Sequence, residues 1–153
     1  MDRIKEVQKY IDTVILETRE EASKKYGYMH LYGVSQFCAI LAYKRKQNVE
    51  LAAIAGLLHD ISRIQNPNAD DHAHNGAVTA QKILLSLEAY SEDEITMVCT
   101  AIYHHSDKET KDSPFDEVLK DADVLQHCLY EPMEQPSSKE TGRFAAIKNE
   151  LGL

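Results

Sequence analysis

The chain has 153 residues, a length that suits one domain with a full-sized hydrophobic core. Hydrophobic residues make up 43% and charged residues 27%, as in an ordinary soluble globular protein, and no apolar run is long enough to span a membrane. The net charge of −8, spread along the chain, argues against a nucleic-acid-binding surface, but it does not exclude a small phosphorylated substrate.

The N-terminal segment and the cysteines both indicate a cytoplasmic protein that inserts into no membrane. Residues 1–21 lack the compact apolar core and the small-residue cleavage site of a signal peptide. Cys38, Cys99 and Cys128 are odd in number and widely spaced, without a CxxC pair. We interpret them as small buried hydrophobes in a reducing compartment.

Apolar residues recur with helical period along the first half of the chain. A first helix is expected over residues 2–25, with the "YGY" at 26–28 interrupting it, and a second over residues 29–46. Asn48 can cap a third helix. After a turn-rich loop at 66–71, a fourth helix is expected to begin near residues 73–76.

The later helix starts are marked more clearly. "SEDE" at 91–94 is a capping box, and "SPFDE" at 113–117 combines a capping serine with proline at the first helical position. Pro132 and Pro136 are expected to end the latter helix, and a short helix is expected over about 139–150. No β-alternation is convincing, so the sequence predicts an all-α fold.

One histidine–aspartate pair stands where the apolar pattern is strongest. His59 and Asp60 follow directly after the apolar run 51–58. Buried polar groups are costly unless they are paired, hydrogen-bonded or bound to a metal. The pair is therefore either part of a buried site or a polar helix end that faces solvent, and the rest of the sequence has to distinguish the two.

Two other polar residues are candidates for the same site. His30 shares a helix face with apolar residues, so we expect it to point inward, as a ligand or as a satisfied core or capping histidine. In "LKDADVLQ", Asp123 lies nearer the apolar face than the competing Asp121. Imidazoles mixed with carboxylates suit Mn²⁺, Fe²⁺, Zn²⁺, Co²⁺ or Ni²⁺, and the lack of a thiolate cluster argues against a structural zinc site.

The order His30, His59–Asp60, Asp123 resembles the HD superfamily of metal-dependent phosphohydrolases. "HLYGVSQFCAILA" resembles the first histidine helix of that family, "LAAIAGLLHDISR" its central helix and "LKDADVL" its final segment. The resemblance covers about residues 28–130, within a single HD domain spanning 1–153. It implies a helical bundle with the metal between helices, and it implies His30, His59, Asp60 and Asp123 as the metal ligands.

The resemblance also implies roles for further histidines, and each of these roles has an alternative. "HAHNGAVTAQKIL" implies His72 as a ligand, with His74 as the alternative in register, and "AIYHHSD" brings in His104 and His105. Together His72, His104 and His105 would complete a second metal site, or else line the pocket and bind substrate.

Two more positions near the motifs bear on the site. His127, one turn after Asp123, is expected to lie behind the ligands or in solvent. Arg63 stands where the family often has lysine, and it could bind a phosphate in a planar, bidentate way unless it is a surface residue.

The resemblance implies a phosphomonoesterase or phosphodiesterase that acts on a nucleotide or another small phosphate ester through a metal-activated water. One or two divalent ions would serve as cofactor, drawn from Fe, Mn, Co, Ni and Zn, with Mg also allowed. Asp60 would orient or deprotonate the water, and Arg63 with His104 or His105 would neutralise charge on the phosphoryl oxygens. A non-catalytic regulatory module that binds metal and nucleotide is the alternative. The oligomeric state is not indicated.

Overall fold

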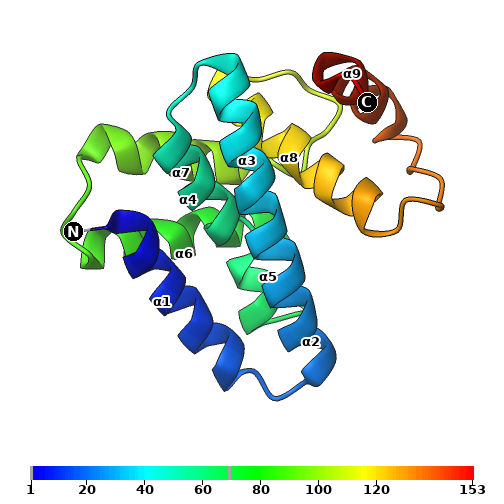
Figure 1. The fold of residues 1–153 in the computed structure, drawn as a ribbon. Coiled ribbons are helices and arrows are strands. Elements are labelled where there is room, and N and C mark those ends of the chain that lie inside the picture. Colours follow the sequence, from blue (N-terminus) through cyan, green and yellow to red (C-terminus); the bar gives the residue numbers. More distant parts are fainter. Residues whose placement is uncertain (1, 69) are drawn as a thin grey trace.

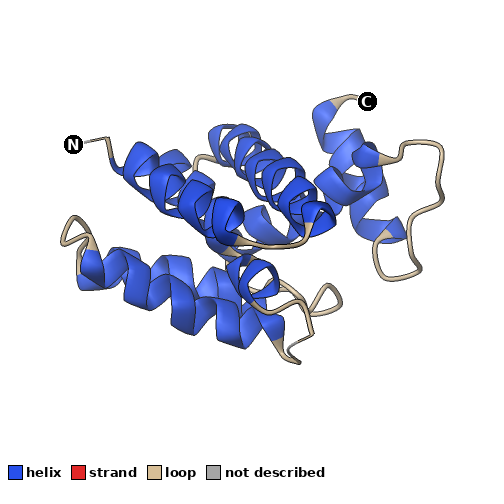
Figure 2. Cartoon of the chain, turned by 90° about the horizontal axis from the view of Figure 1, so that it is seen from below, coloured by secondary structure: helices blue, strands red, loops and turns tan. Residues whose placement is uncertain are grey.

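The structure is a computed structural model that describes residues 2–68 and 70–153, and within these residues every regular element is helical (Figures 1 and 2). The elements are α1 (Arg3–Glu17), α2 (Glu21–Tyr26), the π-helical turn η1 (Gly27–Leu31), α3 (Tyr32–Arg45), α4 (Val49–Leu58), α5 (Ile61–Gln65), α6 (His72–Ser86), α7 (Glu92–His104), α8 (Pro114–Tyr130) and α9 (Thr141–Leu151). The predicted all-α class is confirmed.

Helix α4 forms the centre of the bundle. All residues from Leu51 to Leu58 are buried, which is the expected state of a helix that is apolar on every side. It packs against α1, α3, α7 and α8 (Figure 1). The approach to α3 is close at Gly56, where an added Cβ would lie 2.7 Å from Cα of Ser35. This packing fixes the position of the residues that follow α4.

The helix expected over residues 2–25 is in fact two helices, so that prediction was wrong. Thr18 adopts an extended conformation, and its N–H bonds to the carbonyl of Ile15, which ends α1. The apolar stripe of α1 is buried up to Ile15, and polar residues follow it. Without an apolar face to bury beyond that point, the chain turns and begins α2 at Glu21.

The expected interruption at residues 26–28 was also wrong, because α2, η1 and α3 follow one another without a loop. Gly27 keeps helical dihedrals, and its lack of a side chain lets α1 approach, since a Cβ there would lie 2.9 Å from Cγ1 of Ile15. The wider turn that follows carries His30. Such π-helical turns occur often at functional sites.

The capping predictions are confirmed. Ser91 and Glu94 exchange both hydrogen bonds of a capping box at the start of α7. At the start of α8, Ser113 directly precedes Pro114, and its side chain accepts a hydrogen bond from the N–H of Asp116. Asn48 caps α4. Helix α6 begins at His72, slightly before the expected position, and the short α5 was not predicted.

Ion pairs fasten α9 to the bundle. Nη1 of Arg143 lies 2.6 Å from Oε2 of Glu117 and 2.9 Å from Oδ1 of Asp121, both on α8. Arg45 at the end of α3 bridges Oδ2 of Asp121 and Glu150, each at 2.7 Å. Asp121, which the sequence offered as the alternative to Asp123, therefore forms ion pairs with two arginines.

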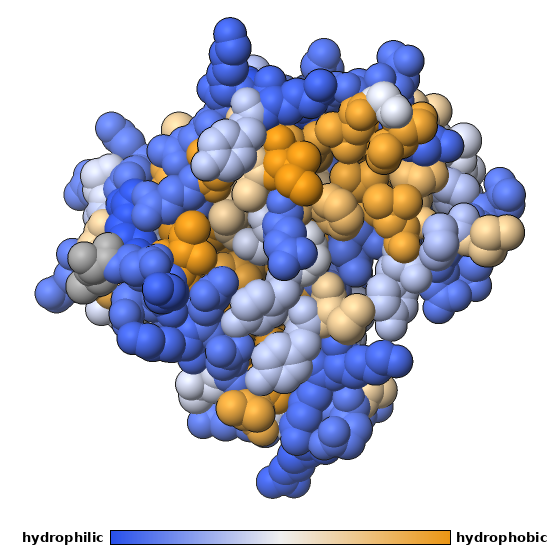
Figure 3. All heavy atoms as spheres, in the orientation of Figure 1, coloured by the Kyte–Doolittle hydropathy of each residue, from blue (hydrophilic) through white to orange (hydrophobic). Residues whose placement is uncertain are grey.

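The surface and the cysteines complete the description. Polar side chains cover most of the face in Figure 3, with apolar areas between them. Within the described part of the chain, no helix combines the length and apolar character that crossing a membrane requires. Cys38 and Cys128 are buried, Cys99 is half-buried, and all three are free thiols.

Candidate metal centre

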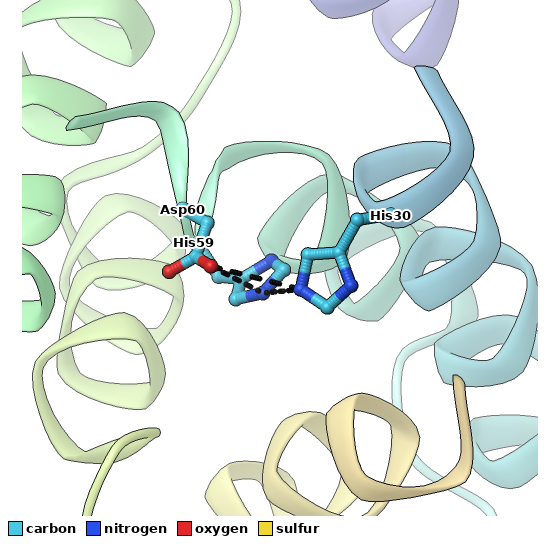
Figure 4. Close-up of side chains that lie close together, drawn as sticks. All are labelled: His30, His59 and Asp60. Carbon is cyan, nitrogen blue, oxygen red and sulfur yellow. Dashed lines mark hydrogen bonds and ion pairs between the residues drawn. The ribbon is translucent and has the colours of Figure 1, made fainter. Parts of the chain in front are cut away.

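Four side chains from three separate elements converge at the inner end of α4. His30 comes from η1, His59 and Asp60 follow α4, and Asp123 comes from the middle of α8. Nε2 of His30 lies 3.1 Å from Nε2 of His59, 3.3 Å from Oδ1 of Asp123 and 3.6 Å from Oδ2 of Asp60. Figure 4 shows His30, His59 and Asp60 pointing toward one another.

The end of α4 explains how two adjacent residues face one point. Neighbouring residues on a regular helix diverge by about 100°. Asp60 leaves helical geometry, with φ −110° and ψ 18°, directly after His59. Its Oδ2 consequently lies 3.8 Å from Nε2 of His59.

The spacing of these atoms matches that of metal ligands. Atoms bound at about 2.1 Å around a tetrahedral metal lie roughly 3.4 Å from one another. The contacts of His30 with the other three side chains, and of His59 with the two carboxylates, run from 3.1 Å to 3.8 Å. His30 and Asp123 lie in helices that pack in the core, and His59 and Asp60 directly follow another such helix, α4.

A second set of atoms gathers around the other oxygen of Asp60. Oδ1 lies 3.3 Å from Nε2 of His105 and 3.6 Å from Nε2 of His72, at the end of α7 and the start of α6. This oxygen is buried and has no hydrogen-bond partner among residues 2–68 and 70–153. Asp60 thus stands between two groups of ligating atoms.

The histidine rings are oriented so that Nε2 is the nitrogen offered to the centre. Nδ1–H of His59 donates to the carbonyl of Gly56 at 2.8 Å, and Nδ1–H of His105 donates to that of Ile102 at 2.7 Å. Nδ1–H of His30 donates to Oε1 of Gln126 at 2.6 Å. On a neutral ring a fixed Nδ1–H leaves an Nε2 lone pair, so acceptors face acceptors unless a metal cation or a proton lies between them.

Burial and charge act against each other on the pKa values here. Burial alone would raise the pKa of Asp60, but the charge of His59 and the contact with His105 hold it well below its usual range. Likewise, burial opposes ionisation of Asp123, whereas Lys108 and the histidines keep its pKa low. Burial lowers the pKa of His105 and of His72, which favours the neutral rings that metals bind.

A cavity of about 560 Å³ opens onto both sets of atoms. Its charged lining includes Lys25, Arg63 and Lys108, and its apolar lining includes Tyr26, Met29 and Tyr130. This combination of an apolar wall with a few convergent polar groups is typical of small-molecule sites.

Arg63 and His127 both line this cavity. Nε of Arg63 lies 3.6 Å from Oδ2 of Asp60, and its Nη2 lies 3.3 Å from both ring nitrogens of His72. His127 is largely exposed, and its Nδ1 lies 2.8 Å from Oε1 of Glu140. The structure therefore places the Arg63 guanidinium beside the candidate ligands, and His127 farther out.

The structure separates His104 from its neighbour His105. Nδ1 of His104 lies 2.8 Å from Oδ2 of Asp116 and 3.8 Å from Oδ1 of Asp112, and the ring does not line the cavity. It is the last residue of α7, whereas His105 begins the turn toward the centre. The structure therefore places His104 in a separate group with Asp112 and Asp116, away from Asp60 and the cavity.

His72 and His74, the two alternatives in register, also have different surroundings. His74 pairs with Asp71 at 2.7 Å and stacks on the ring of Tyr103, with centroids 3.7 Å apart. It lies away from the cavity that His72 lines. Of the two registers, the structure brings His72 to Asp60.

Three residues at the centre were not expected in these positions. The hydroxyl of Tyr26 donates to Oδ2 of Asp60 at 2.8 Å, and its ring stacks on His30. Burial raises the pKa of Tyr26, which keeps that donor protonated. Gln126 lies three residues after Asp123, a helical spacing that could have revealed it. Lys108 lies in a loop, and no periodic signal marks it.

Comparison with known proteins agrees with this geometry. A sequence model of the HD domain family matches residues 27–127, a span that includes all four residues of the first set, as well as His72 and His105. The chain therefore belongs to the HD domain family.

Two individual proteins illustrate the likeness. The chain is 34% identical over 98 residues to Ribonuclease Y 2 of Levilactobacillus brevis, covering 63% of this chain and 17% of that protein. A crystal structure of a predicted HD superfamily hydrolase from an uncultured Thermotogales bacterium superposes with a TM-score of 0.63. The match covers 94% of this chain and 88% of that one at 22% sequence identity, and it shows a shared fold.

Proposed function

We propose that the chain is a metal-dependent phosphohydrolase acting on a nucleotide or another small phosphate ester. The observation that carries the proposal is the position of Asp60. Each of its oxygens faces a separate group of imidazole nitrogens, and the buried Oδ1 has no hydrogen-bond partner in the described chain. Such an arrangement of acceptors is stabilised by cations.

The residues fit one or two divalent ions. His30, His59 and Asp60, with Asp123 beside the two histidines, would hold the first. His72, His105 and the second oxygen of Asp60 would hold another. Neutral imidazoles mixed with carboxylates favour Mn, Fe, Co, Ni or Zn, with Mg also allowed by the carboxylates. A bound ion of this kind supplies a water of lowered pKa and positive charge for the phosphoryl oxygens.

The protein residues around the centre provide the rest of the site. Arg63 is close to Asp60 and its side chain is 47% exposed, so its guanidinium can reach a phosphate in the cavity and bind it through two N–H groups. Tyr26 and Gln126 hold Asp60 and His30 through hydrogen bonds. The carboxylates remain ionised at neutral pH because their pKa values are low.

The cavity supports a small substrate. Its volume of about 560 Å³ lies in the range of small-molecule sites, roughly 300–1,000 Å³. Tyr26, Met29 and Tyr130 offer apolar surface against which a base or another ring could pack. The net charge of −8 disfavours a long polyanion. Because one relative is named a ribonuclease, phosphodiesters belong in any substrate screen beside monoesters.

The test combines metal content with turnover. Protein purified without chelators is analysed for metal, loaded with Mn²⁺, Co²⁺ or Ni²⁺, and screened against nucleoside monophosphates, cyclic nucleotides and short dinucleotides. Asp60→Ala and Asp123→Ala should abolish both metal retention and turnover, whereas Asp93→Ala, at an exposed position on α7, should not. Full activity in both site variants would overturn the assignment. Bound metal with ligand-induced stabilisation but no turnover would favour a non-catalytic binding module.

A further inference from the structure

Lys108 makes two hydrogen bonds at the edge of the candidate metal centre. It lies in the loop between α7 and α8, yet its side chain is only 10% exposed. Nζ donates to Oδ2 of Asp123 at 2.5 Å and to the carbonyl of His105 at 2.6 Å. Lysine is rarely buried without a partner, so these contacts account for its placement.

The two oxygens of Asp123 consequently have different surroundings. Oδ1 faces Nε2 of His30 at 3.3 Å and Nε2 of His59 at 3.7 Å, whereas Oδ2 is held by Lys108. A carboxylate with both oxygens free can bind a cation through one or through both. An ammonium group on one oxygen leaves the other as the available ligand.

The loop that carries Lys108 is held by the C-terminal helix. Arg143 on α9 donates from Nε to the carbonyl of Lys108 at 2.7 Å and from Nη2 to that of Thr110 at 3.1 Å. The same guanidinium is anchored on α8 through Glu117 and Asp121. Arg143 lies beyond residues 27–127, so an element outside the region matched by the family model fixes the position of Lys108.

We propose that Lys108 is a positioning residue, which engages Oδ2 of Asp123 so that the carboxylate offers one oxygen to a bound cation. The inference rests on the proposed metal centre and deepens it. Catalytic metal sites keep a position open for water or substrate. By occupying Oδ2, Lys108 prevents Asp123 from filling such a position itself.

The experiment uses the full chain loaded with one equivalent of Co²⁺, whose visible absorption weakens as the number of ligands increases. The variants are Lys108→Met and, as a matched control, Lys111→Met at an exposed position of the same loop. We expect Lys108→Met to keep its Co²⁺, because a nearby positive charge has been removed, and to show a weaker, shifted band. Lys111→Met should match the wild type.

Arg143→Lys provides a second variant if Lys108→Met does not fold. A lysine keeps the charge but cannot donate to the Lys108 carbonyl and to both carboxylates through a planar fork. Its Co²⁺ band should shift in the same direction as that of Lys108→Met. A wild-type spectrum in Lys108→Met, or in Arg143→Lys where it alone can be measured, would overturn the proposal.

The spectrum separates this inference from the proposed function. Wild-type protein that binds Co²⁺ without hydrolysing any ester would remove the enzyme assignment, while a shifted band in Lys108→Met would still support the positioning residue. Active wild-type protein with an unchanged band in the variant would remove the positioning residue alone. Failure of the wild type to bind Co²⁺ would overturn both.

Discussion

The contact between α3 and α4 gives a sharp prediction for Gly56→Ala. A Cβ at Gly56 would lie 2.7 Å from Cα of Ser35, 2.8 Å from N of Ser35 and 3.1 Å from C of Val34. All three are backbone atoms, so no side chain can rotate to make room. The two helices would have to separate at the point where they pack most closely.

The expected magnitude follows from two opposing effects. Alanine is favoured over glycine inside a helix by about 1 kcal/mol. Overpacking a core typically costs about 1–3 kcal/mol, and the rigid backbone obstacle at Gly56 places this case at the upper end. The net loss in unfolding free energy is therefore about 2 kcal/mol, which lowers the Tm by roughly 4–8 °C for a domain of this size.

Urea unfolding followed by circular dichroism measures this change, with Gly142→Ala as the control. Gly142 is also helical, but a Cβ there would have nothing within 4 Å among the described residues. That variant should gain up to about 1 kcal/mol. If Gly56→Ala were as stable as the wild type, or if both variants shifted in the same direction, the packing argument would fail.

Three further outcomes are expected. Ser91→Ala removes the hydroxyl of the capping box and should lower the unfolding free energy by about 1 kcal/mol in urea, whereas the neighbouring exposed Glu92→Ala should lower it less. Burial opposes ionisation of Glu117, but Arg143 lowers its pKa below 4.5, so its stabilisation is present above pH 4.5 and is lost as the pH falls further. Unfolding measured from pH 6 to pH 3 should accordingly show a shallower decline for Glu117→Gln. Finally, Co²⁺ at 100 times its Kd should add about 2.7 kcal/mol to the unfolding free energy of the wild type and nothing to that of Asp60→Ala, as read from thermal shifts.

The sequence predicted the helices well where their ends carry a chemical signal. Ser91 and Ser113 each precede the residues that complete a cap, and both caps form. The division at Thr18 was missed although the apolar stripe ends at Ile15, and the π-helical turn at His30 has no periodic signal of its own in the sequence. Gly27 was read as an interruption, whereas it permits close contact within a continuing helix.

The residues of the candidate site could be predicted where they belong to motifs that follow one another in a fixed order along the sequence. The four residues from His30 to Asp123 come together as the resemblance implied. Adjacent histidines could not be separated in the same way, since the direction of His104 and His105 is decided by where α7 ends. Lys108 belongs to a loop, and its distance to Asp123 depends on the long-range contact with Arg143.

The cavity wall is built partly from residues inside the span that the family model matches and partly from residues outside it. The candidate ligands all lie within residues 27–127, whereas Lys25 and Tyr26 precede that span, and Tyr130 and Glu140 follow it. Substitutions at Lys25, Tyr130 or Glu140 can reshape the cavity wall while leaving the central cluster intact, unlike a change at Tyr26, which bonds to Asp60. Relatives that share the same histidines and aspartates can therefore differ in the molecule they accept, and the residues at 22–25 and 130–140 are the ones to compare first.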